Sequence, residues 1–301
     1  MDYTRDNIRK PVVSGQFYEG NFNNLNKQIE TCFYSNKGPG ELPIKRRLNK
    51  LIGVISPHAG YFFSGPCASW AYMEIAESEF PHAYVILGPN HYNVFSGLSK
   101  KDWETPLGII KTEKEIIKLL EEKTNLKVNE SCHEFEHSIE VQLPFLQFAS
   151  RDRLDDLRIV PISLGHDIEF RDIGKQLYNV FFNLLKNKKI VFIISSDFTH
   201  YGRNYGYLPF TSDIKKRIYD LDNGAIELIK KIDVIGLKEY LNNTGITICG
   251  YIPILVFLSM LNEMKEKENK NIKSIVLMHY TSGDVIGDFK NSVSYVSMAF
   301  R

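Results

Sequence analysis

The chain contains little cysteine and has no cysteine pair at close spacing. Its cysteines, Cys32, Cys67, Cys132 and Cys249, are far apart along the 301 residues and form no CxxC motif. This spacing excludes the disulfide framework of a small secreted domain. The N-terminal stretch MDYTRDNIRKP has no apolar run, so a signal peptide is not expected. We therefore expect a protein of the reducing cytoplasm.

Long hydrophobic runs and an excess of charge are also missing. The longest apolar stretch, residues 251–261, is too short to span a bilayer and is interpreted as a core helix, so no membrane association is expected. The 37 basic and 36 acidic residues give a net charge of +1. The most basic short stretch, residues 45–50, is interpreted as a solvated loop. This charge pattern argues against a surface that binds nucleic-acid phosphates, so no nucleic-acid partner is expected.

No internal repeat and no Ser/Gly/Pro linker divides the chain, which predicts a single domain over residues 1–301. Several short runs rich in Ile and Val lack period-two alternation, which is typical of strands buried on both faces. Helix-like segments lie between them. This order predicts an α/β fold: a three-layer sandwich with a mixed, mainly buried central sheet and helices on both faces. The predicted strands cover residues 51–55, 83–87, 158–164, 190–195, 275–279 and 293–299.

Two local signals refine this picture. In WETPLGII, residues 103–110, Pro and Gly are placed for a tight turn, which predicts a hairpin and hence some antiparallel pairing. The Ser-Gly-Pro sequence at residues 64–66 predicts a helix start with Pro in the first turn.

Three predicted strands run directly into polar residues. One leads into SPHAGY with His58, one into GPNHYN with His91, and one into SDFTHYG with Asp197 and His200. In open α/β sheets, ligands bind outside the carboxyl ends of the strands. A lone histidine near a core is usually structural, but histidines after three such strands predict one shared site. His279 also ends a strand and is interpreted as a core residue or as a support behind that site.

A fourth polar cluster lies in CHEFEHSIEVQLPFL, residues 132–146. His137 and Glu140 are one helical turn apart and are predicted to share a face. Glu136 and His137 can be metal ligands, acid/base groups or a helix-capping pair, and Glu136 can also simply complement the helix dipole. His133 is interpreted as solvated.

Cys249 lies in NTGITICGYIP, just before the predicted core helix. A free cysteine is usually buried and inert, whereas one near a helix N-terminus has a stabilised thiolate. Two imidazoles and one thiolate would make a three-ligand site with an open position. Such a site suits Zn²⁺, Fe²⁺ or Cu ions, and not Mg²⁺ or Ca²⁺.

The motifs PHAGY, LGPNH, EHSIEVQLP, SSDFTHYG and TICG occur in this order, with SGQFYEG near the N-terminus and SVSY near the C-terminus. This set resembles the Memo family (mediator of ErbB2-driven cell motility), and the resemblance spans nearly the whole chain. The family is similar in fold to the catalytic subunit of LigB-type class III extradiol dioxygenases, an α/β sandwich that uses non-haem iron. The resemblance therefore implies a LigB/Memo-like α/β fold.

The resemblance also implies a metal pocket formed by His58, His91 and Cys249, with Asp197 and His200 beside it. Family members have been linked to iron or copper binding and to redox chemistry. The dioxygenases have a carboxylate where the family has a thiolate. Because a softer ligand changes metal preference and redox behaviour, ring cleavage does not follow from the resemblance.

An animal member of the family has been described as binding phosphotyrosine peptides. The animal motif has Trp followed by Tyr where this chain has Phe17 and Tyr18, and it ends in Tyr past PHAGY where this chain has Phe62 and Phe63. No arginine cluster stands out to pair a phosphate. We therefore do not expect phosphotyrosine binding here.

The first hypothesis is a cytoplasmic metal-binding protein of redox type, in which His58, His91 and Cys249 hold Fe²⁺ or Cu, with Zn²⁺ also fitting. An open position would take water, O₂ or an organic ligand. Asp197 would orient a ligand histidine or balance its charge, and His200 and His137 would move protons.

Two alternatives remain open. One is a metal-free cysteine hydrolase or transferase with Cys249 as nucleophile, activated by His200 and Asp197. The other is a non-catalytic module that binds a peptide or a small ligand through aromatic residues near the site. These residues are Phe17, Tyr18, Tyr61, Phe62 and Tyr92.

Overall fold

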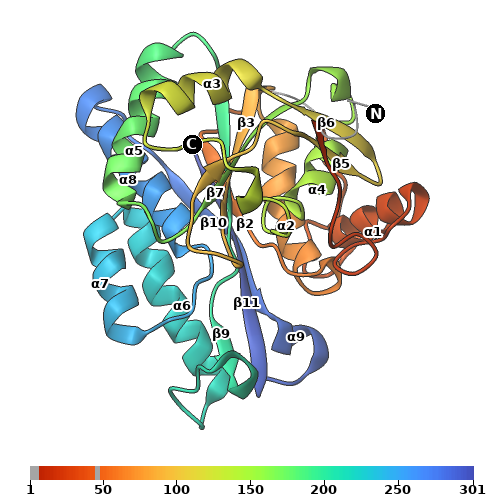
Figure 1. Ribbon diagram of the computed structural model, residues 1–301. Helices are drawn as coiled ribbons and strands as arrows, with labels where there is room; N and C mark the ends of the chain where they lie inside the picture. Colours follow the sequence, from red (N-terminus) through yellow and green to blue (C-terminus); the bar gives the residue numbers. More distant parts are fainter. Residues whose placement is uncertain (1–6, 45–47) are drawn as a thin grey trace.

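The computed structural model describes residues 7–44 and 48–301, so residues 45–47 of the basic stretch lie outside the described residues. Within this part of the chain the strands form one mixed sheet of eleven strands (Figure 1). Neighbours follow the order β1-β5-β6-β7-β3-β8-β2-β11-β10, while β4 pairs with β7 and β9 with β11. The strands are β1 (Ile8–Arg9), β2 (Gly53–Ser56), β3 (Ala83–Pro89), β4 (Gly97–Leu98), β5 (Asp102–Thr105), β6 (Gly108–Thr112), β7 (Arg158–Leu164), β8 (Ile190–Ser195), β9 (His200–Gly202), β10 (Ser274–Thr281) and β11 (Asn291–Phe300).

The centre of the sheet is parallel and one side is antiparallel. β3 pairs in parallel with β7 and β8, and β8 pairs in parallel with β2. β11 runs antiparallel to β2 and β10. The hairpin predicted from WETPLGII is present as the antiparallel pair β5 and β6. The prediction of a mixed central sheet is therefore confirmed.

The predicted strands lie close to the observed ones, and all of them except the partly buried β10 are almost completely buried. β7 and β8 have the predicted bounds, β3 extends two residues further, and β2 is displaced towards the C-terminus. Alternate residues of β3 enter opposite cores: Val85 and Leu87 pack into one, and Tyr84 and Ile86 into the other.

Helices cover both of these cores (Figure 1). One core includes buried residues of α1, α2 and α4, and the other includes buried residues of α3, α5, α6, α7 and α8. The helices are α1 (Phe22–Tyr34), α2 (Tyr61–Glu77), α3 (Lys114–Lys123), α4 (Gln142–Ala149), α5 (Phe170–Tyr178), α6 (Ile214–Lys231), α7 (Val234–Thr244), α8 (Tyr251–Glu268) and α9 (Ser282–Ile286), with a π-helical stretch at Asn179–Leu184 and 3₁₀ helices at Glu130–Cys132, Leu154–Asp156 and Arg203–Tyr205.

Two helices bear on the sequence predictions. The apolar run 251–261 forms the first part of α8 and is mostly buried. None of the helices in the described ranges has both the length and the apolar character needed to cross a membrane.

The prediction for α2 was wrong, because the helix begins at Tyr61 and contains Pro66 in its interior. The earlier start is favoured because the Tyr61 amide donates to the carbonyl of Phe17 at 2.7 Å.

A buried ion pair fixes the N-terminal segment against the residues that precede α4. The pair joins Arg9 and Glu140, whose side chains are 4% and 0% exposed. The Glu140 carboxylate also accepts hydrogen bonds from the amides of Val12 and Val13 and from the Tyr18 hydroxyl. These contacts hold the segment that carries Phe17 next to the candidate site.

Candidate metal centre

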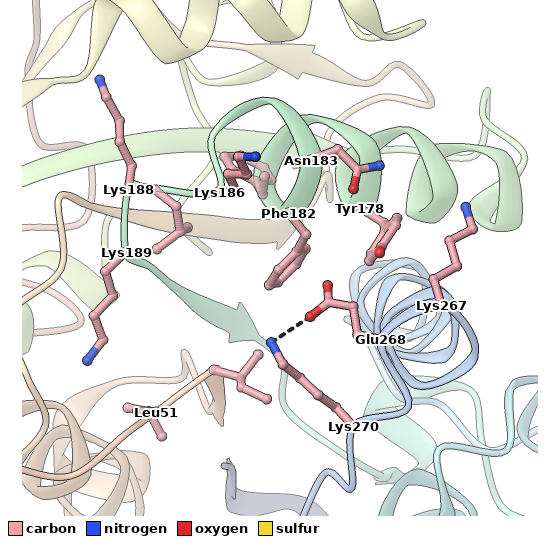
Figure 2. Close-up of a pocket in the computed structure, with 13 residues that line it drawn as sticks. Leu51, Tyr178, Phe182, Asn183, Lys186, Lys188, Lys189, Lys267, Glu268 and Lys270 are labelled. Atoms are coloured by element: carbon pink, nitrogen blue, oxygen red, sulfur yellow. Dashed lines mark ion pairs between the residues drawn. The ribbon is translucent and has the colours of Figure 1, made fainter.

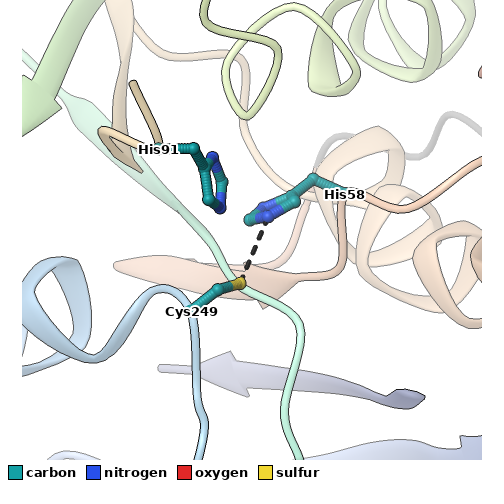
Figure 3. A group of neighbouring side chains, drawn as sticks. All are labelled: His58, His91 and Cys249. Carbon is teal, nitrogen blue, oxygen red and sulfur yellow. Dashed lines mark hydrogen bonds between the residues drawn. The ribbon is translucent and has the colours of Figure 1, made fainter. Parts of the chain in front are cut away.

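Three neighbouring strands bring the predicted site residues to one edge of the sheet. β3, β8 and β2 are adjacent and parallel, so their carboxyl ends meet at the same edge. His91 follows β3, Asp197 follows β8 and His58 follows β2. Cys249 joins them from the segment that leads into α8, and Figure 3 shows its side chain together with the two imidazole rings.

His58, His91 and Cys249 form a compact group. Nε2 of His58 lies 3.2 Å from Sγ of Cys249, and the ring centroids of His58 and His91 are 5.3 Å apart. Taking one ligand atom from each residue, these atoms all lie within 4.8 Å of one another. The fold thus brings together the residues that the resemblance implied as ligands.

Hydrogen bonds of Ser195 fix the ring proton of His58 on Nδ1. The Ser195 hydroxyl donates to the carbonyl of Ser138 at 2.6 Å and accepts from the side-chain amide of Gln142 at 2.8 Å. Because its own hydrogen is already used, Ser195 accepts from Nδ1 of His58, which is 2.8 Å away. Nε2 of His58 therefore carries a lone pair on the side of Cys249.

Glu136 has the same effect on His91. Its carboxylate accepts from ring Nδ1 of His91 at 3.0 Å, from the His91 amide at 2.6 Å and from the Ser138 amide at 2.8 Å. Burial raises the pKa of Glu136, but the hydrogen bonds and charge of His91 outweigh burial and lower this pKa to about 2. An ionised acceptor keeps a proton on Nδ1 of His91. Burial lowers the pKa of this imidazole, but the hydrogen bond and charge of Glu136 outweigh burial and raise it. A metal would therefore bind at Nε2 in place of the second ring proton.

The surroundings of Cys249 favour a neutral thiol. Burial raises the pKa of this thiol well above its ordinary value, and the charge of Asp197 raises it further. Burial likewise lowers the pKa of His58 well below its ordinary value. For Cys249, burial therefore outweighs the stabilisation of the thiolate that was expected from the nearby N-terminus of α8. A metal cation would reverse this balance, because a coordinated thiol loses its proton.

Glycine at position 250 lets the Cys249 segment pack against the end of β8. A Cβ atom on Gly250 would lie 2.5 Å from the carbonyl oxygen of Ser195 and 2.5 Å from Cβ of Ser196. The backbone amide of Asp197, just after β8, donates to Sγ of Cys249 at 3.2 Å. The sulfur is thus held in place by the backbone around it.

Asp197 and His200 lie beside Cys249, and ligand atoms of the three residues are also within 4.8 Å of one another. We predicted that Asp197 orients a ligand ring or balances its charge. Its carboxylate accepts from the backbone amide of His58 at 2.9 Å, and Glu136 is the carboxylate that binds a ring, so charge balance remains as the prediction for Asp197. Nδ1 of His200 lies 2.9 Å from the carbonyl of Phe198 and 3.0 Å from that of Thr247. Since carbonyls only accept, Nδ1 of His200 carries the proton and its Nε2 is free to accept one.

His137 packs against His91 at the rim of the group. The two rings are stacked, with centroids 4.8 Å apart and planes inclined by 20°, and the ring of Phe17 meets His137 edge-on at 5.0 Å. Nδ1 of His137 lies 3.5 Å from Glu136. His137 and Glu140 precede α4, so they do not lie on the helix that was predicted to carry them, although both contact the N-terminal segment, His137 through Phe17 and Glu140 through Arg9.

His133 is buried, whereas the sequence predicted a solvated residue. Its exposed fraction is 0%. Nε2 of His133 donates to the carbonyl of Gly97 at 3.0 Å, and the ring meets Trp103 edge-on. Its Nδ1 is buried with no hydrogen-bond partner in the part of the chain that the structure describes. A proton added there would be buried without an acceptor, so the ring is held neutral.

Lowering the pH from 7 to 4 is expected to destabilise the protein through His133. Burial is the main reason that the pKa of His133 falls from 6.5 to about 4 in the folded state. Between these values the unfolded state binds more protons, so stability decreases as the pH falls and this contribution levels off below about pH 4. The shift corresponds to about 3 kcal/mol. Urea unfolding at both pH values should show a His133→Gln variant losing less stability than the wild type by about this amount.

Exposed His82 supplies the control for that measurement. Its side chain is 36% exposed, so a His82→Gln variant should keep the pH dependence of the wild type. Equal pH dependence in the His133→Gln variant and the wild type would contradict the assignment of a neutral buried ring.

The aromatic residues predicted to line a ligand pocket separate into two kinds. Tyr18 and Tyr61 are each 2% exposed, and their hydroxyls bond to Glu140 and to the Val141 carbonyl. The prediction is wrong for Tyr61, whereas Tyr18 lies in the wall of the pocket that Phe17 lines. Both belong to the core beneath the N-terminal segment. Tyr92 is 62% exposed. Phe17 lines a pocket of about 350 Å³ together with Phe62 and Phe63.

Sequence reasoning missed the polar residues behind the two histidines. Gln142 is buried, accepts from the Tyr72 hydroxyl at 2.7 Å, and donates to Ser195. Ser195 was interpreted only as the end of a strand. The available signal was the two glutamines that flank the apolar run LPFL, Gln142 and Gln147, since a buried amide requires polar partners.

A second hollow, of about 600 Å³, lies at the opposite edge of the sheet, beside the first residue of β8 and the residues before β2. Lysine side chains surround it, as Figure 2 shows. Most of them have acidic partners: Lys188 pairs with Glu115, Lys189 with Glu79, Lys267 with Glu263 and Lys270 with Glu268. Because these glutamates offset most of the positive charge, we assign no anion site to it.

The fold and these side chains define a class: an α/β protein with a histidine–cysteine group at the carboxyl edge of a mixed sheet. The family described as "Memo-like protein" matches residues 9–299. This chain therefore belongs to the Memo-like family, and the resemblance noted from its motifs is confirmed.

Curated relatives agree with this assignment. A MEMO1 family protein from Saccharolobus islandicus is 37% identical, with 97% of this chain and 99% of the relative covered. One from Sulfurisphaera tokodaii is 38% identical with the same coverage of 97% and 99%. Among solved structures, an uncharacterized protein from Escherichia coli K12 is similar with a TM-score of 0.47 and 12% identity, covering 83% of this chain and 99% of that chain.

Proposed function

We propose that this chain binds one iron or copper ion through Nε2 of His58, Nε2 of His91 and Sγ of Cys249, and that it is a metal protein of redox type. The observation that supports this most is the convergence of two imidazole rings, each with its Nδ1 hydrogen-bonded elsewhere, and one thiol, with ligand atoms within 4.8 Å of one another. Imidazole and thiolate donors suit iron, copper and zinc and do not suit Mg²⁺ or Ca²⁺.

An iron or copper ion bound there would supply one-electron redox chemistry and an open position for a small ligand. The protein itself would supply orientation and proton transfer. Ser195 and Glu136 hold the two rings in the required tautomer. His200 presents an unprotonated Nε2 that can accept a proton from a ligand in the pocket. His137, stacked on His91 at the rim, would be a second proton acceptor near the ligand.

The cysteine-hydrolase alternative has less support. A thiol nucleophile needs a base that removes its proton, and burial raises the pKa of Cys249. The ring at hydrogen-bond distance from its sulfur is that of His58, at 3.2 Å, whereas His200 is only within 4.8 Å. Asp197 is hydrogen-bonded to a backbone amide and so does not form the predicted Asp197–His200 pair. The binding-module alternative is weaker because Tyr61 is buried, although Phe17, Tyr18, Phe62 and Phe63 line a small pocket.

Elemental analysis of anaerobically purified protein tests the proposal. We expect about one iron or copper ion per chain in the wild type, and less than about a tenth of this in Cys249→Ala, because a three-ligand site that loses its thiolate binds metal poorly. Cys132→Ala is the matched control, since Cys132 is a free buried cysteine outside the group and its loss should leave the metal content unchanged. Zinc alone would support the site and refute the redox part. No transition metal in the wild type, even after reconstitution with Fe²⁺ and Cu⁺, would refute the proposal.

A further inference from the structure

A buried acid–imidazole pair lies behind the segment that carries His200. Asp222 of α6 is 0% exposed. Its Oδ1 accepts from the amide of Thr199 at 3.2 Å and from the Thr199 hydroxyl at 2.5 Å, and its Oδ2 lies 3.0 Å from Nε2 of His279. The Tyr219 ring covers His279 with centroids 4.6 Å apart. A buried carboxylate is costly unless it is paired and hydrogen-bonded, so this arrangement restrains the Thr199 backbone strongly.

The restraint reaches His200 through a single peptide group. The amide of Thr199 donates to Asp222, and the carbonyl of the same peptide unit, that of Phe198, accepts from Nδ1 of His200 at 2.9 Å. Asp222, the peptide and the imidazole therefore form one chain of hydrogen bonds. A peptide that donates to a carboxylate is polarised and becomes a better acceptor, so the chain favours a proton on Nδ1 of His200.

The rest of the segment is fixed independently. The backbone carbonyl of Ser294 accepts from the Phe198 amide at 2.8 Å, and the backbone amide of Ser294 donates to the Thr199 carbonyl at 2.9 Å. The Thr247 hydroxyl, two residues before Cys249, accepts from the His200 amide at 2.8 Å. These contacts keep the backbone in place, which leaves the plane of the Phe198–Thr199 peptide as the feature that depends on Asp222. The Thr247 carbonyl also lies 3.0 Å from Nδ1 of His200, so Asp222 acts on one of the two acceptors of this proton.

We propose that Asp222, with His279 as its charge partner, is the positioning residue for His200: it orients the Phe198–Thr199 peptide, and this peptide holds the imidazole with Nδ1 protonated and Nε2 free. The proposal rests on the proposed function only in that His200 serves the metal pocket. Its structural content, the tautomer of His200, is independent of any metal.

Nitrogen NMR of the His200 side chain in metal-free protein tests the proposal. We expect the wild type to be in the Nδ1–H tautomer and Asp222→Asn to show a detectable share of the Nε2–H tautomer. A neutral amide polarises the Phe198–Thr199 peptide less than a carboxylate does, which leaves the Thr247 carbonyl as the main acceptor of the Nδ1 proton. Thr199→Val removes only the hydroxyl and should give a smaller change in the same direction, which keeps the test valid if Asp222→Asn fails to fold. Thr199→Ser keeps the amide and the hydroxyl that donate to Asp222, so its spectrum should match that of the wild type.

Asp284→Asn is the matched control. Asp284 lies on the far side of Tyr219, where it binds Lys215 and the Tyr219 hydroxyl and caps α9. Its variant should lose stability but keep the wild-type His200 spectrum. The proposal is overturned if Asp222→Asn and Thr199→Val both keep the wild-type tautomer, or if Asp284→Asn changes it equally. Metal content tests the proposed function separately from the role of Asp222. A wild type that binds no metal refutes the proposed function, whereas the tautomer comparison still decides the role of Asp222.

Discussion

Replacing Glu140 by alanine is expected to lower the free energy of unfolding by about 3–5 kcal/mol, the usual cost of removing one partner of a buried ion pair. The substitution leaves the Arg9 guanidinium buried without its carboxylate. It also removes the acceptor for the amides of Val12 and Val13 and for the Tyr18 hydroxyl. Chemical unfolding monitored by circular dichroism measures the change.

An exposed ion pair in the same segment provides the control. Lys10 and Glu104 are also paired, but their side chains are 61% and 33% exposed. Glu104→Ala should therefore cost less than about 1 kcal/mol. Adding Arg9→Met to Glu140→Ala should recover part of the lost stability, since it removes the unpaired charge. Similar losses for Glu140→Ala and Glu104→Ala would contradict the assignment of a buried, structural ion pair.

The central strands and their ends could be predicted because their signals are local. β7 and β8 are continuous apolar runs, and runs of this kind can be placed from the sequence wherever both faces are buried. The residue after such a strand then lies at the carboxyl edge, so His58, His91 and Asp197 could be assigned to one site before their contacts were known.

Side-chain direction in turns could not be predicted, because it depends on partners far away in the sequence. His133, Glu136 and Glu140 all look like surface residues of a polar turn. They are buried because the N-terminal segment folds over them and Arg9 contacts all three, through the carbonyls of His133 and Glu136 and the carboxylate of Glu140. Tyr18 is directed inwards for the same reason, since its acceptor is Glu140. More than 120 residues separate Arg9 from these partners.

The contacts of Asp222 could not be predicted from the sequence either. It lies on an amphipathic helix where a single Asp is typical of an exposed position. Only the packing of α6 against β10 brings it to His279, 57 residues further along the chain.

Glu136→Gln is expected to weaken metal binding by about 10–100-fold, the usual effect of removing a carboxylate that orients a ligand histidine. Both carboxylate oxygens of Glu136 accept hydrogen bonds, one from the amide of His91 and the other from Nδ1 of His91 and the Ser138 amide. Glutamine offers one acceptor oxygen, so a donor of His91 or Ser138 would face an amide NH₂ group. The ring of His91 would then lose the restraint that keeps its Nε2 directed at the metal. Competition with a chelator of known affinity measures the change.

Glu134→Gln is the matched control, because Glu134 lies two residues away in the same turn and is exposed. It should bind metal like the wild type. Glu136 differs from Glu134 only through the fold, which buries it to 1% exposure against His91. If both variants bound metal like the wild type, the hydrogen bond of Glu136 would hold the turn together without tuning the ligand. If Glu136→Gln lost metal while its unfolding transition matched that of Glu134→Gln, the loss would come from the orientation of His91 and not from a loosened fold.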